Sequence, residues 1–552
     1  HPPVITVFTA ARVHTMDPSL PEATAVAVRD GRIVEVGSLE SLQPWLSRHE
    51  HVVDDRFADA VILPGLIDPH VHPSMMAGLL ACEWIVAEDW DLPGRHVPAT
   101  IGEAAYLDRL CELEAALPSG EPLVVYGHHP QFHGPIDRAV LDGVSPDRPI
   151  VVWPRGYHEF RCNSRALEWL DAEEAAAWDP YIDLESGRMW ESGMAWGMRV
   201  LNRHLIGGDR LEPLLRGIAD MVHRGGATTI CDAGFGIGGP DRDLEAFCDV
   251  YGGSTTPFRT FIMPSAMVFE RVFKDEARNR MEAMAASAGG SAGGSTERVQ
   301  HLRSVKFYAD GSFMSQLCQV GEPGFIDGHE GAWMTEPDIL VLRIRPYWEA
   351  GYQINVHVTG DAGLEVTLDA IDTLLHETPR FDHRTVIHHF AVSTQAQVRR
   401  IAALGCAVQP NGYYMAQFGD VMVDEWLGTE RAGLITRVGS ARRHGVSVAL
   451  HSDLPMGPLL PLRGASLLAT RRTASGRVPA PTECLSPYDA MAAVTIEAAW
   501  QLRLDHEIGS LAAGKLADLV VLDGDPFELD LADWPDIPIR ATVVGGEVFP
   551  VA

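Results

Sequence analysis

Short hydrophobic runs alternate with longer segments of mixed polarity through the middle of the chain. This alternation is typical of β-strands followed by helices, the repeating unit of a parallel sheet. The strand candidates are eight runs at residues 61–66, 227–231, 259–263, 304–308, 353–358, 385–388, 406–409 and 446–450. Because a (β/α)₈ barrel needs eight strands, the pattern predicts an α/β fold with a TIM barrel over residues 63–507.

Both ends of the chain have a different pattern, in which short alternating runs are separated by tight turns. Near the start these runs are at residues 5–9, 25–29 and 32–36, and the last two flank Asp30-Gly31, a strong hairpin signal. Near the end they are at residues 517–522 and 541–549. Since neither end buries much alone, we predict that residues 1–62 and 508–552 form one small composite β-sandwich domain.

The gap of about 150 residues between the first two barrel strands is far longer than one crossover connection. It contains further strand-like runs at residues 123–126 and 150–153. We therefore predict a long insertion, at about residues 75–205, that lies over the mouth of the barrel. A separate stretch of Gly, Ala and Ser at residues 287–295 predicts a flexible surface loop.

Composition and charge narrow the range of partners. The chain has 552 residues, 46% of them hydrophobic, and its 44 Lys and Arg against 75 Asp and Glu give a net charge of −31. Such acidity argues against nucleic acid as a partner and against binding to anionic membrane surfaces. No run approaches the roughly 18–20 apolar residues of a membrane span. A small-molecule substrate is the expected partner.

The cysteines and the N-terminus bear on the cellular compartment. The eight cysteines are scattered and form no CxxC pair, which favours a reducing compartment over a disulfide framework. The first residues lack the basic patch and apolar run of a signal peptide. We therefore expect a cytoplasmic protein, and a barrel of this size is compatible with either a monomer or a homodimer.

The sharpest chemical signal is a pair of histidines, His70 and His72, which follow the first candidate strand. Side chains at positions i and i+2 of an extended chain point the same way, so both imidazoles can reach one point. Two nitrogen donors at this spacing suit zinc or a similar divalent ion. The other interpretation is a pair of surface or core histidines. Barrel enzymes build their active sites at the carboxyl ends of strands, and this position favours the metal site.

Three further groups occupy equivalent places at the ends of candidate strands: His357, His389 and Asp453. The separation 389 − 357 = 32 matches one βα unit, and 453 − 389 = 64 matches two. Any one of these residues alone would be unremarkable. Their common phase with the strands predicts that they converge on the same end of the barrel.

Lys306 lies inside the candidate strand at residues 304–308. A lysine that points into a barrel is costly unless it is paired or neutralised. Carboxylation of its amine by CO₂ would give two carbamate oxygens that can bridge two metal ions. The residues alone leave open the alternative that Lys306 pairs with a buried acid or binds substrate.

Several motifs resemble those of the amidohydrolase superfamily. Residues 64–72 (PGLIDPHVH) are similar to its first-strand motif, and residues 509–522 are similar to its return to the β-domain. The stretches 162–167, 305–312 and 355–361 resemble the YtcJ-like branch more closely, which includes N-substituted formamide deformylases. The resemblance covers nearly the whole chain and implies a metal-bearing TIM barrel with a β-sandwich made from both termini.

The resemblance also implies the residues of the site. The implied metal ligands are His70, His72, carboxylated Lys306, His357, His389 and Asp453. One or two divalent ions are implied, with zinc as the expected metal and the carboxylated Lys306 as the bridging ligand. Two further residues, His158 and Glu191, match positions near the substrate pocket and are expected to bind substrate.

The sixth candidate strand departs from the pattern of this branch. The branch usually has Glu-His at this place, whereas this chain has His388-His389. The ligand role is assigned to His389, because His388 should face the opposite side of the strand. The alternative that His388 is the ligand stays open. Loss of the acidic neighbour affects the contacts that support the metal or the substrate.

Weaker candidates surround these residues. An apolar pocket for the substrate is one interpretation of the aromatic and Met residues near the strand ends or in the insertion, and inter-element core is the other: Met75, Met76, Trp84, Trp90, Phe313, Met314, Tyr413, Tyr414 and Met456. His128, His129 and His133 are interpreted as a solvated loop. His451 shares the direction of Asp453, so it is a candidate for a contact with substrate or with a metal ligand.

These residues predict a metal-dependent hydrolase of a non-peptide C–N bond, in an amide, N-substituted formamide, urea or cyclic amide. A bound ion would acidify a water and polarise the scissile carbonyl, and Asp453 would move the proton to the leaving nitrogen. The alternative is a lyase, of decarboxylase or retro-aldol type, on the same site, since fold and metal do not fix the reaction. A non-catalytic binding protein would be expected to have lost some ligands, and every implied position is filled.

Overall fold

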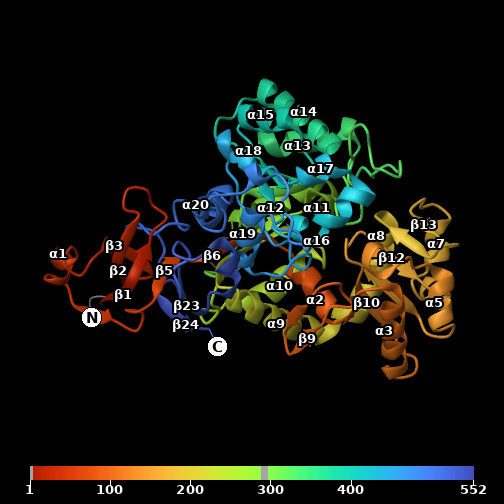
Figure 1. Ribbon diagram of the computed structural model, residues 1–552, viewed down its shortest axis with the longest axis horizontal. Helices are drawn as coiled ribbons and strands as arrows, with labels where there is room; N and C mark the ends of the chain where they lie inside the picture. Colours follow the sequence, from red (N-terminus) through yellow and green to blue (C-terminus); the bar gives the residue numbers. More distant parts are fainter. Residues whose placement is uncertain (1–3, 287–295, 552) are drawn as a thin grey trace.

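The computed structural model describes residues 4–286 and 296–551 (Figure 1). The loop predicted at residues 287–295 lies outside the described residues. No helix of the described part is long and apolar enough to cross a membrane. All eight cysteines lie in the described part, and none of them forms a disulfide bond there.

Strands from both ends of the chain pair in one eight-stranded sheet, at the left of Figure 1. Its order is β24-β23-β22-β5-β1-β2-β3, with β4 paired to β1. These strands are β1 (Ile5–His14), β2 (Glu22–Arg29), β3 (Arg32–Gly37), β4 (His51–Asp54), β5 (Val61–Pro64), β22 (Leu519–Leu522), β23 (Ile539–Val544) and β24 (Glu547–Pro550). Asp30 and Gly31 form the predicted hairpin turn, both with positive φ, 52° and 75°. The predicted pairing of the two ends is therefore confirmed at the level of this sheet.

The predicted strand at residues 61–66 is wrong as one element. β5 pairs with β1 and β22 in the terminal sheet, whereas the next strand, β6 (Leu66–Val71), pairs with β15 (Ala227–Phe235) in the middle of the chain. Gly65 separates the two strands, and a Cβ there would lie 1.9 Å from Thr228 Oγ1. The chain therefore passes from one sheet to the other at a position that has room only for glycine. A continuous hydrophobic run conceals this change of sheet.

The middle of the chain contains two four-stranded parallel sheets, of order β17-β16-β15-β6 and β18-β19-β20-β21. The remaining strands are β16 (Arg259–Pro264), β17 (Val299–His301), β18 (Ser304–Tyr308), β19 (Gln353–Val358), β20 (Val386–His389) and β21 (Ala407–Pro410). Six of the eight predicted runs fall in these strands. A parallel bridge between Ser265 and Lys306 connects the sheets. Residues 446–450 form no strand, since Val448 makes only an isolated bridge to Val408.

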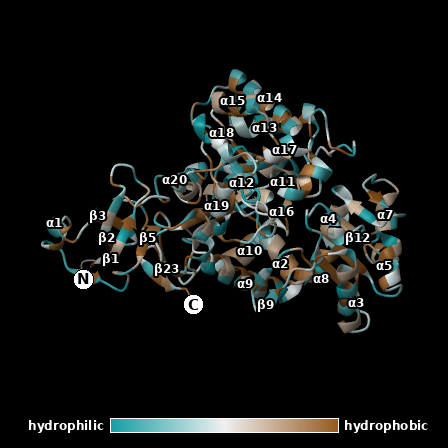
Figure 2. Cartoon of the chain, in the orientation of Figure 1, coloured by the Kyte–Doolittle hydropathy of each residue, from teal (hydrophilic) through white to brown (hydrophobic). Residues whose placement is uncertain are grey.

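Helices follow most of these strands, as the alternating pattern predicts. They are α2 (Pro73–Leu80), α9 (Leu211–Arg224), α10 (Pro240–Tyr251), α11 (Ala266–Phe273), α12 (Ala277–Ala286), α13 (Pro337–Glu349), α14 (Asp361–Glu377), α15 (Gln395–Ala403), α16 (Tyr414–Val421), α17 (Thr429–Gly433), α18 (Val438–Arg443), α19 (Pro461–Thr470), α20 (Pro487–Ala492) and α21 (Ile496–Gln501). In α14 the buried Leu364, Leu368 and Ile371 recur at helical spacing. Figure 2 shows hydrophilic and hydrophobic positions mixed along α13, α14 and α15.

The segment between β6 and β15 contains a sheet of its own, of order β13-β14-β12-β11-β10-β7. Its strands are β7 (Glu83–Trp84), β10 (Leu123–His128), β11 (Ile150–Pro154), β12 (Glu159–Cys162), β13 (Ile182–Asp183) and β14 (Arg188–Trp190). The helices around it include α3 (Glu103–Ala116), α5 (Arg138–Val144), α7 (Ala172–Ala176) and α8 (Ser192–Ile206). The runs predicted at residues 123–126 and 150–153 lie in β10 and β11, which pair in parallel. This segment forms the lobe at the right of Figure 1.

Candidate metal centre

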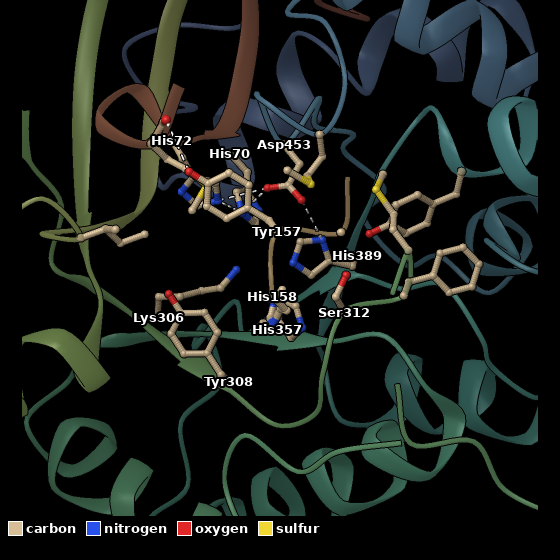
Figure 3. A pocket seen from close by; sticks show the side chains of 17 residues that line it. His70, His72, Tyr157, His158, Lys306, Tyr308, Ser312, His357, His389 and Asp453 are labelled. Carbon is tan, nitrogen blue, oxygen red and sulfur yellow. Dashed lines mark hydrogen bonds and ion pairs between the residues drawn. The ribbon is translucent and has the colours of Figure 1, made fainter. Parts of the chain in front are cut away.

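A cavity of about 90 Å³ lies where β6, β18, β19 and β20 end (Figure 3). All of the implied metal ligands line it, namely His70, His72, Lys306, His357, His389 and Asp453. They come from segments that are far apart in the sequence. Parallel strands bring their carboxyl ends to the same edge, which is why these side chains meet there.

His70, His72 and Asp453 form the tightest part of the site. The Nε2 atoms of the two histidines lie 3.1 Å apart, which confirms that the i, i+2 spacing brings both imidazoles to one point. Asp453 Oδ1 lies 3.3 Å from His70 Nε2 and 3.0 Å from His72 Nε2. All three residues are buried. The backbone holds them in register, because the Asp453 N–H donates to the carbonyl of His70 at 3.1 Å.

His389 and His357 complete the other side of the site. Their ring centroids lie 4.4 Å apart, and His389 Nδ1 is 3.7 Å from Asp453 Oδ2. His389 and Asp453 both have positive φ, 72° and 57°. Non-glycine residues rarely adopt such backbone, and strained positions of this kind cluster at functional sites. The backbone thus leaves the extended conformation at both residues.

The expectation that His388 faces away from the site is wrong. Its Nδ1 accepts a hydrogen bond from Lys306 Nζ, and its Nε2–H donates to Asn355 Oδ1 at 3.2 Å. Its ring centroid lies 4.5 Å from that of His70. Because the backbone of His389 leaves the extended conformation, side-chain alternation stops there, and both adjacent imidazoles enter the same region. His388 does not line the cavity but lies behind Lys306.

His451 is more central than its sequence position indicates. Its ring stacks on that of His70 with centroids 4.3 Å apart. Donor atoms of His70, His451 and Asp453 all lie within 4.8 Å of one another, close enough to hold one metal ion. As expected for residues two apart, His451 and Asp453 project toward the same place.

The protonation states of His70, His357 and Asp453 suit metal ligands, whereas His72 must lose a proton to bind a metal ion. Burial, and then the charge of Lys306, lowers the pKa values of His70 and His357 well below the usual range, so both imidazoles are neutral. Burial also lowers the pKa of Lys306 to about 7. Although burial favours the neutral form of Asp453, its contacts with His72 outweigh burial and lower its pKa. Neutral imidazoles beside an ionised carboxylate are the donors that zinc prefers.

Several buried ring nitrogens lack a hydrogen-bond partner: His70 Nδ1, His72 Nδ1, His389 Nδ1 and both nitrogens of His451. Buried polar atoms without partners are costly and rare in folded proteins. A divalent cation accepts a lone pair from a ring nitrogen, so it would relieve this cost at His389 Nδ1 and at one nitrogen of His451. The residues present therefore fit a divalent metal ion.

Asp232 supports His72 from behind, and sequence reasoning missed it. It lies in β15, and its Oδ1 is 3.6 Å from His72 Nδ1. Burial opposes the charged imidazolium, yet Asp232 and Asp453 together raise the pKa of His72 to about 9. A carboxylate behind a ligating histidine is the usual device that orients its ring. The signal was available, because Asp232 directly follows the run predicted at residues 227–231.

His158 and Glu191 form a pair at the edge of the cavity. The imidazole Nδ1–H of His158 donates to Glu191 Oε1 at 3.0 Å. Burial disfavours the charged ring, but Glu191 outweighs burial and raises the pKa of His158. His158 lines the cavity, with its ring centroid 6.0 Å from that of His357, whereas Glu191 lies behind it.

The apolar wall agrees only in part with the sequence. Of the predicted aromatic and Met residues, those that line the cavity are Met75, Phe313, Met314, Tyr414 and Met456. The others are buried in the core: Met76, Trp84, Trp90 and Tyr413. Sequence reasoning missed Tyr157, Ile237 and Tyr308, which also line it. Tyr157 and Ile237 lie in irregular segments whose direction the hydrophobic pattern does not determine, whereas Tyr308 is the last residue of β18.

The solvated loop predicted for His128, His129 and His133 is wrong, because all three side chains are buried. His128 Nε2–H donates to the carbonyl of Gly134 at 2.9 Å, and His133 Nε2–H donates to that of Thr100 at 2.9 Å. His129 Nε2–H donates to a backbone carbonyl in the cavity wall, that of Met314, at 3.2 Å. Backbone carbonyls satisfy these histidines, which therefore belong to the core of the lobe.

Imidazoles and a carboxylate buried at the carboxyl ends of parallel strands are typical of metal-dependent enzymes with an α/β fold. Comparison with known sequences places the chain more narrowly. It belongs to the Amidohydrolase family, whose pattern matches residues 58–550.

Three relatives match nearly the whole chain. Protein LONG AFTER FAR-RED 3 of Arabidopsis thaliana is 26% identical, over 99% of this chain and 91% of the relative. YtcJ of Bacillus subtilis is 24% identical, over 97% of each. The N-substituted formamide deformylase of Arthrobacter pascens is 23% identical, over 97% and 96%. The resemblance to the YtcJ-like branch is thereby confirmed.

A solved structure shares the fold. An uncharacterized metal-dependent hydrolase from Pyrococcus horikoshii superposes with a TM-score of 0.71 at 17% identity, over 96% of this chain and 99% of that one.

Proposed function

We propose that the protein is a metal-dependent hydrolase of a non-peptide C–N bond, in an amide, N-substituted formamide, urea or cyclic amide. The observation that carries the proposal is the buried group in which His70 Nε2, His72 Nε2 and Asp453 Oδ1 lie within 3.3 Å of one another. Membership of the Amidohydrolase family supports the reaction class. The similarity to a formamide deformylase supports the C–N bond.

The two parallel sheets are inferred to be one (β/α)₈ barrel. In this barrel β17 and β18, separated only by residues 302–303, count as one strand, and residues 446–451 take the place of the eighth. Two observations support closure of the ring. His451 bridges Asn411 beyond β21, and the N–H of Asp453 donates to the carbonyl of His70 in β6. In this arrangement residues 1–62 with 508–552 are the composite β-sandwich domain. Residues 75–205 are the insertion over the barrel mouth.

The implied ligands are proposed to hold one or two divalent ions, with zinc as the expected metal: His70, His72, carboxylated Lys306, His357, His389 and Asp453. His451 joins them as a further candidate, because it lies within ligand distance of His70 and Asp453. A bound ion supplies Lewis acidity to the scissile carbonyl and to a water molecule.

Within this proposal Asp453 and Lys306 each have a defined chemical role. Asp453 accepts the proton of the attacking water on a carboxylate oxygen and returns it to the leaving nitrogen. Its lowered pKa keeps it ionised and ready for the first step. Lys306, as a carbamate, provides the bridging oxygens. Its lowered pKa, about 7, supports this role because CO₂ reacts with the neutral amine.

The substrate is proposed to be a small molecule with an apolar or aromatic group. The wall formed by Met75, Phe313, Met314, Tyr414 and Met456 supports this proposal. His158, held by Glu191, offers a polar contact to the substrate beside that wall.

The test combines metal analysis with a substrate screen. Protein loaded with zinc and the Asp453→Asn variant are assayed against amides, formamides and ureas, with detection of free amine and acid. The proposal predicts metal in the purified wild type and a loss of about 10²–10⁴-fold in turnover for the variant. Full activity of the metal-replete variant would contradict the role of Asp453. Release of CO₂ or an aldehyde without uptake of water would favour the lyase instead.

A further inference from the structure

One turn of the insertion lines the cavity, and the catalytic proposal gives a role to only one of its four residues, His158. It connects β11 to β12 and comprises residues 155–158, hereafter the 155–158 turn. Gly156, Tyr157 and His158 all line the cavity, and Figure 3 shows Tyr157 and His158 beside the metal-centre residues. We infer that Tyr157 sets the largest apolar group that the substrate can carry, and that Arg155 is the residue that positions it. The inference rests on the proposed function.

Tyr157 is held rigidly although its backbone is strained. Its φ is 70°, in the left-handed region that tyrosine rarely adopts. Its ring lies 4.5 Å from that of Trp153, and its hydroxyl donates to the carbonyl of Met75 at 3.4 Å. Strained residues persist only where the surroundings fix them, and they gather at sites where geometry matters. Tyr157 therefore presents a fixed face to the cavity.

Arg155 connects the turn to the segment that carries Asp453. Its side chain is 3% exposed, and its Nη2–H donates to the carbonyl of Met456 at 2.8 Å. It also forms an ion pair with Glu88. Met456 lines the cavity and is three residues beyond Asp453. A buried guanidinium that donates to this carbonyl fixes the distance between the turn and the metal centre.

Gly156 closes the turn against the opposite wall. A Cβ at this position would lie 1.7 Å from Ser315 Oγ, so the backbone of the turn lies directly against the segment that follows β18. Two other residues of that segment, Phe313 and Met314, line the cavity. The turn is thus fixed on two sides, by Arg155 toward Met456 and by Gly156 toward Ser315.

A wall fixed in this way discriminates by size. In a preformed apolar pocket one methylene changes kcat/KM by about 10–200-fold, because a rigid wall cannot move to admit it. If the polar residues of the cavity hold the reacting bond, the apolar group of the substrate lies between Tyr157 and the apolar wall that includes Met75 and Met456. Removing the phenol ring should admit longer groups without touching the polar side.

The experiment uses zinc-loaded full-length protein and two homologous series, N-alkyl formamides and N-methyl alkanamides, each from methyl to hexyl length. The variants are Tyr157→Ala, Tyr157→Phe and, as a matched control, Tyr488→Ala, an exposed tyrosine of α20. In the series whose alkyl chain lies against Tyr157, the wild-type kcat/KM should fall by about tenfold or more for each methylene beyond a limiting length. Tyr157→Ala should move that limit to longer chains, whereas Tyr157→Phe and Tyr488→Ala should keep it.

An unchanged limiting length in Tyr157→Ala, with all substrates slowed by the same factor, would overturn the inference while leaving the proposed function intact. Inactivity of the wild type on every amide would overturn the proposed function itself.

Arg155 has a separate test. Arg155→Met should weaken the dependence of KM on chain length and leave kcat for the shortest substrate unchanged. Arg155→Lys can still donate a hydrogen bond to the carbonyl of Met456, so this variant should keep the wild-type dependence of KM on chain length. Wild-type length dependence in Arg155→Met would refute the positioning role.

Discussion

Replacement of Asp232 by asparagine is expected to weaken zinc binding about tenfold without unfolding the protein. The perturbation removes the carboxylate charge behind His72 and keeps the shape of the side chain. Asp232 Oδ1 lies 3.6 Å from His72 Nδ1, and both groups are buried. The contact is an ion pair longer than a hydrogen bond, so the lower end of the roughly 10–100-fold range for groups that orient metal-ligating histidines applies. A loss of about 1.4 kcal/mol corresponds to a tenfold weaker affinity.

The assay is competition for zinc against a chromophoric chelator, with the dissociation constant measured for each variant. Asp179→Asn is the matched control, because Asp179 is also buried but accepts its hydrogen bonds from Tyr181 and Ser192 in the insertion. Circular dichroism and thermal unfolding establish that both variants fold. If Asp232→Asn and Asp179→Asn bind zinc as tightly as the wild type, Asp232 does not orient His72 and the reasoning fails.

The remaining predictions concern the bridging lysine, the attachment of the terminal sheet and acid stability. Lys306→Ala is expected to lower the metal content per chain measured by plasma mass spectrometry, and unchanged content would contradict the bridging role. Asp518→Ala should lower the free energy of unfolding by about 3–5 kcal/mol in a denaturant titration, because it leaves a buried guanidinium unpaired. In the wild type Arg259 Nε donates to Asp518 Oδ2 at 2.7 Å, and a variant with the wild-type midpoint would refute this estimate of the ion pair. Burial lowers the pKa of His129 from 6.5 to about 4, so the unfolded state binds more protons between these values and stability falls as pH falls through this window. His129→Asn should therefore reduce the slope of unfolding free energy against pH by up to about 1.4 kcal/mol per pH unit, and an unchanged slope would contradict it.

Hydrophobic periodicity predicted most of the sheet structure. Runs such as 353–358 and 227–231 lie in β19 and β15, where every residue is buried, as in strands that are covered on both faces. The same reasoning failed at residues 61–66. There Gly65 ends β5 and the chain enters another sheet within an unbroken apolar run, so nothing in the periodicity marks the boundary.

The candidate site was predictable where a residue's place along a strand decides its position. His70 and His72 follow from the i, i+2 rule, and His357 and Asp453 from the spacing of βα units. Asp232 could have been found by the same rule. His128, His129 and His133 could not be assigned, because their burial depends on backbone carbonyls such as those of Thr100 and Met314, which are distant in the sequence.

The error at His388 shows where the rule of alternation ceases to apply. Alternation holds only while the backbone is extended, and His389 has a φ of 72°. Because of this change in the backbone, the His389 side chain points toward Asp453. The His388 side chain points toward Lys306 and accepts a hydrogen bond from it. Two adjacent histidines therefore serve one centre from two directions, one in the cavity and one behind the lysine. Asp453, with a φ of 57°, likewise departs from extended backbone, two residues after the isolated bridge at His451. Active sites of parallel α/β proteins lie at strand ends, and strand ends are where regular backbone stops. Sequence periodicity thus predicts where such a site lies better than it predicts the direction in which its side chains point.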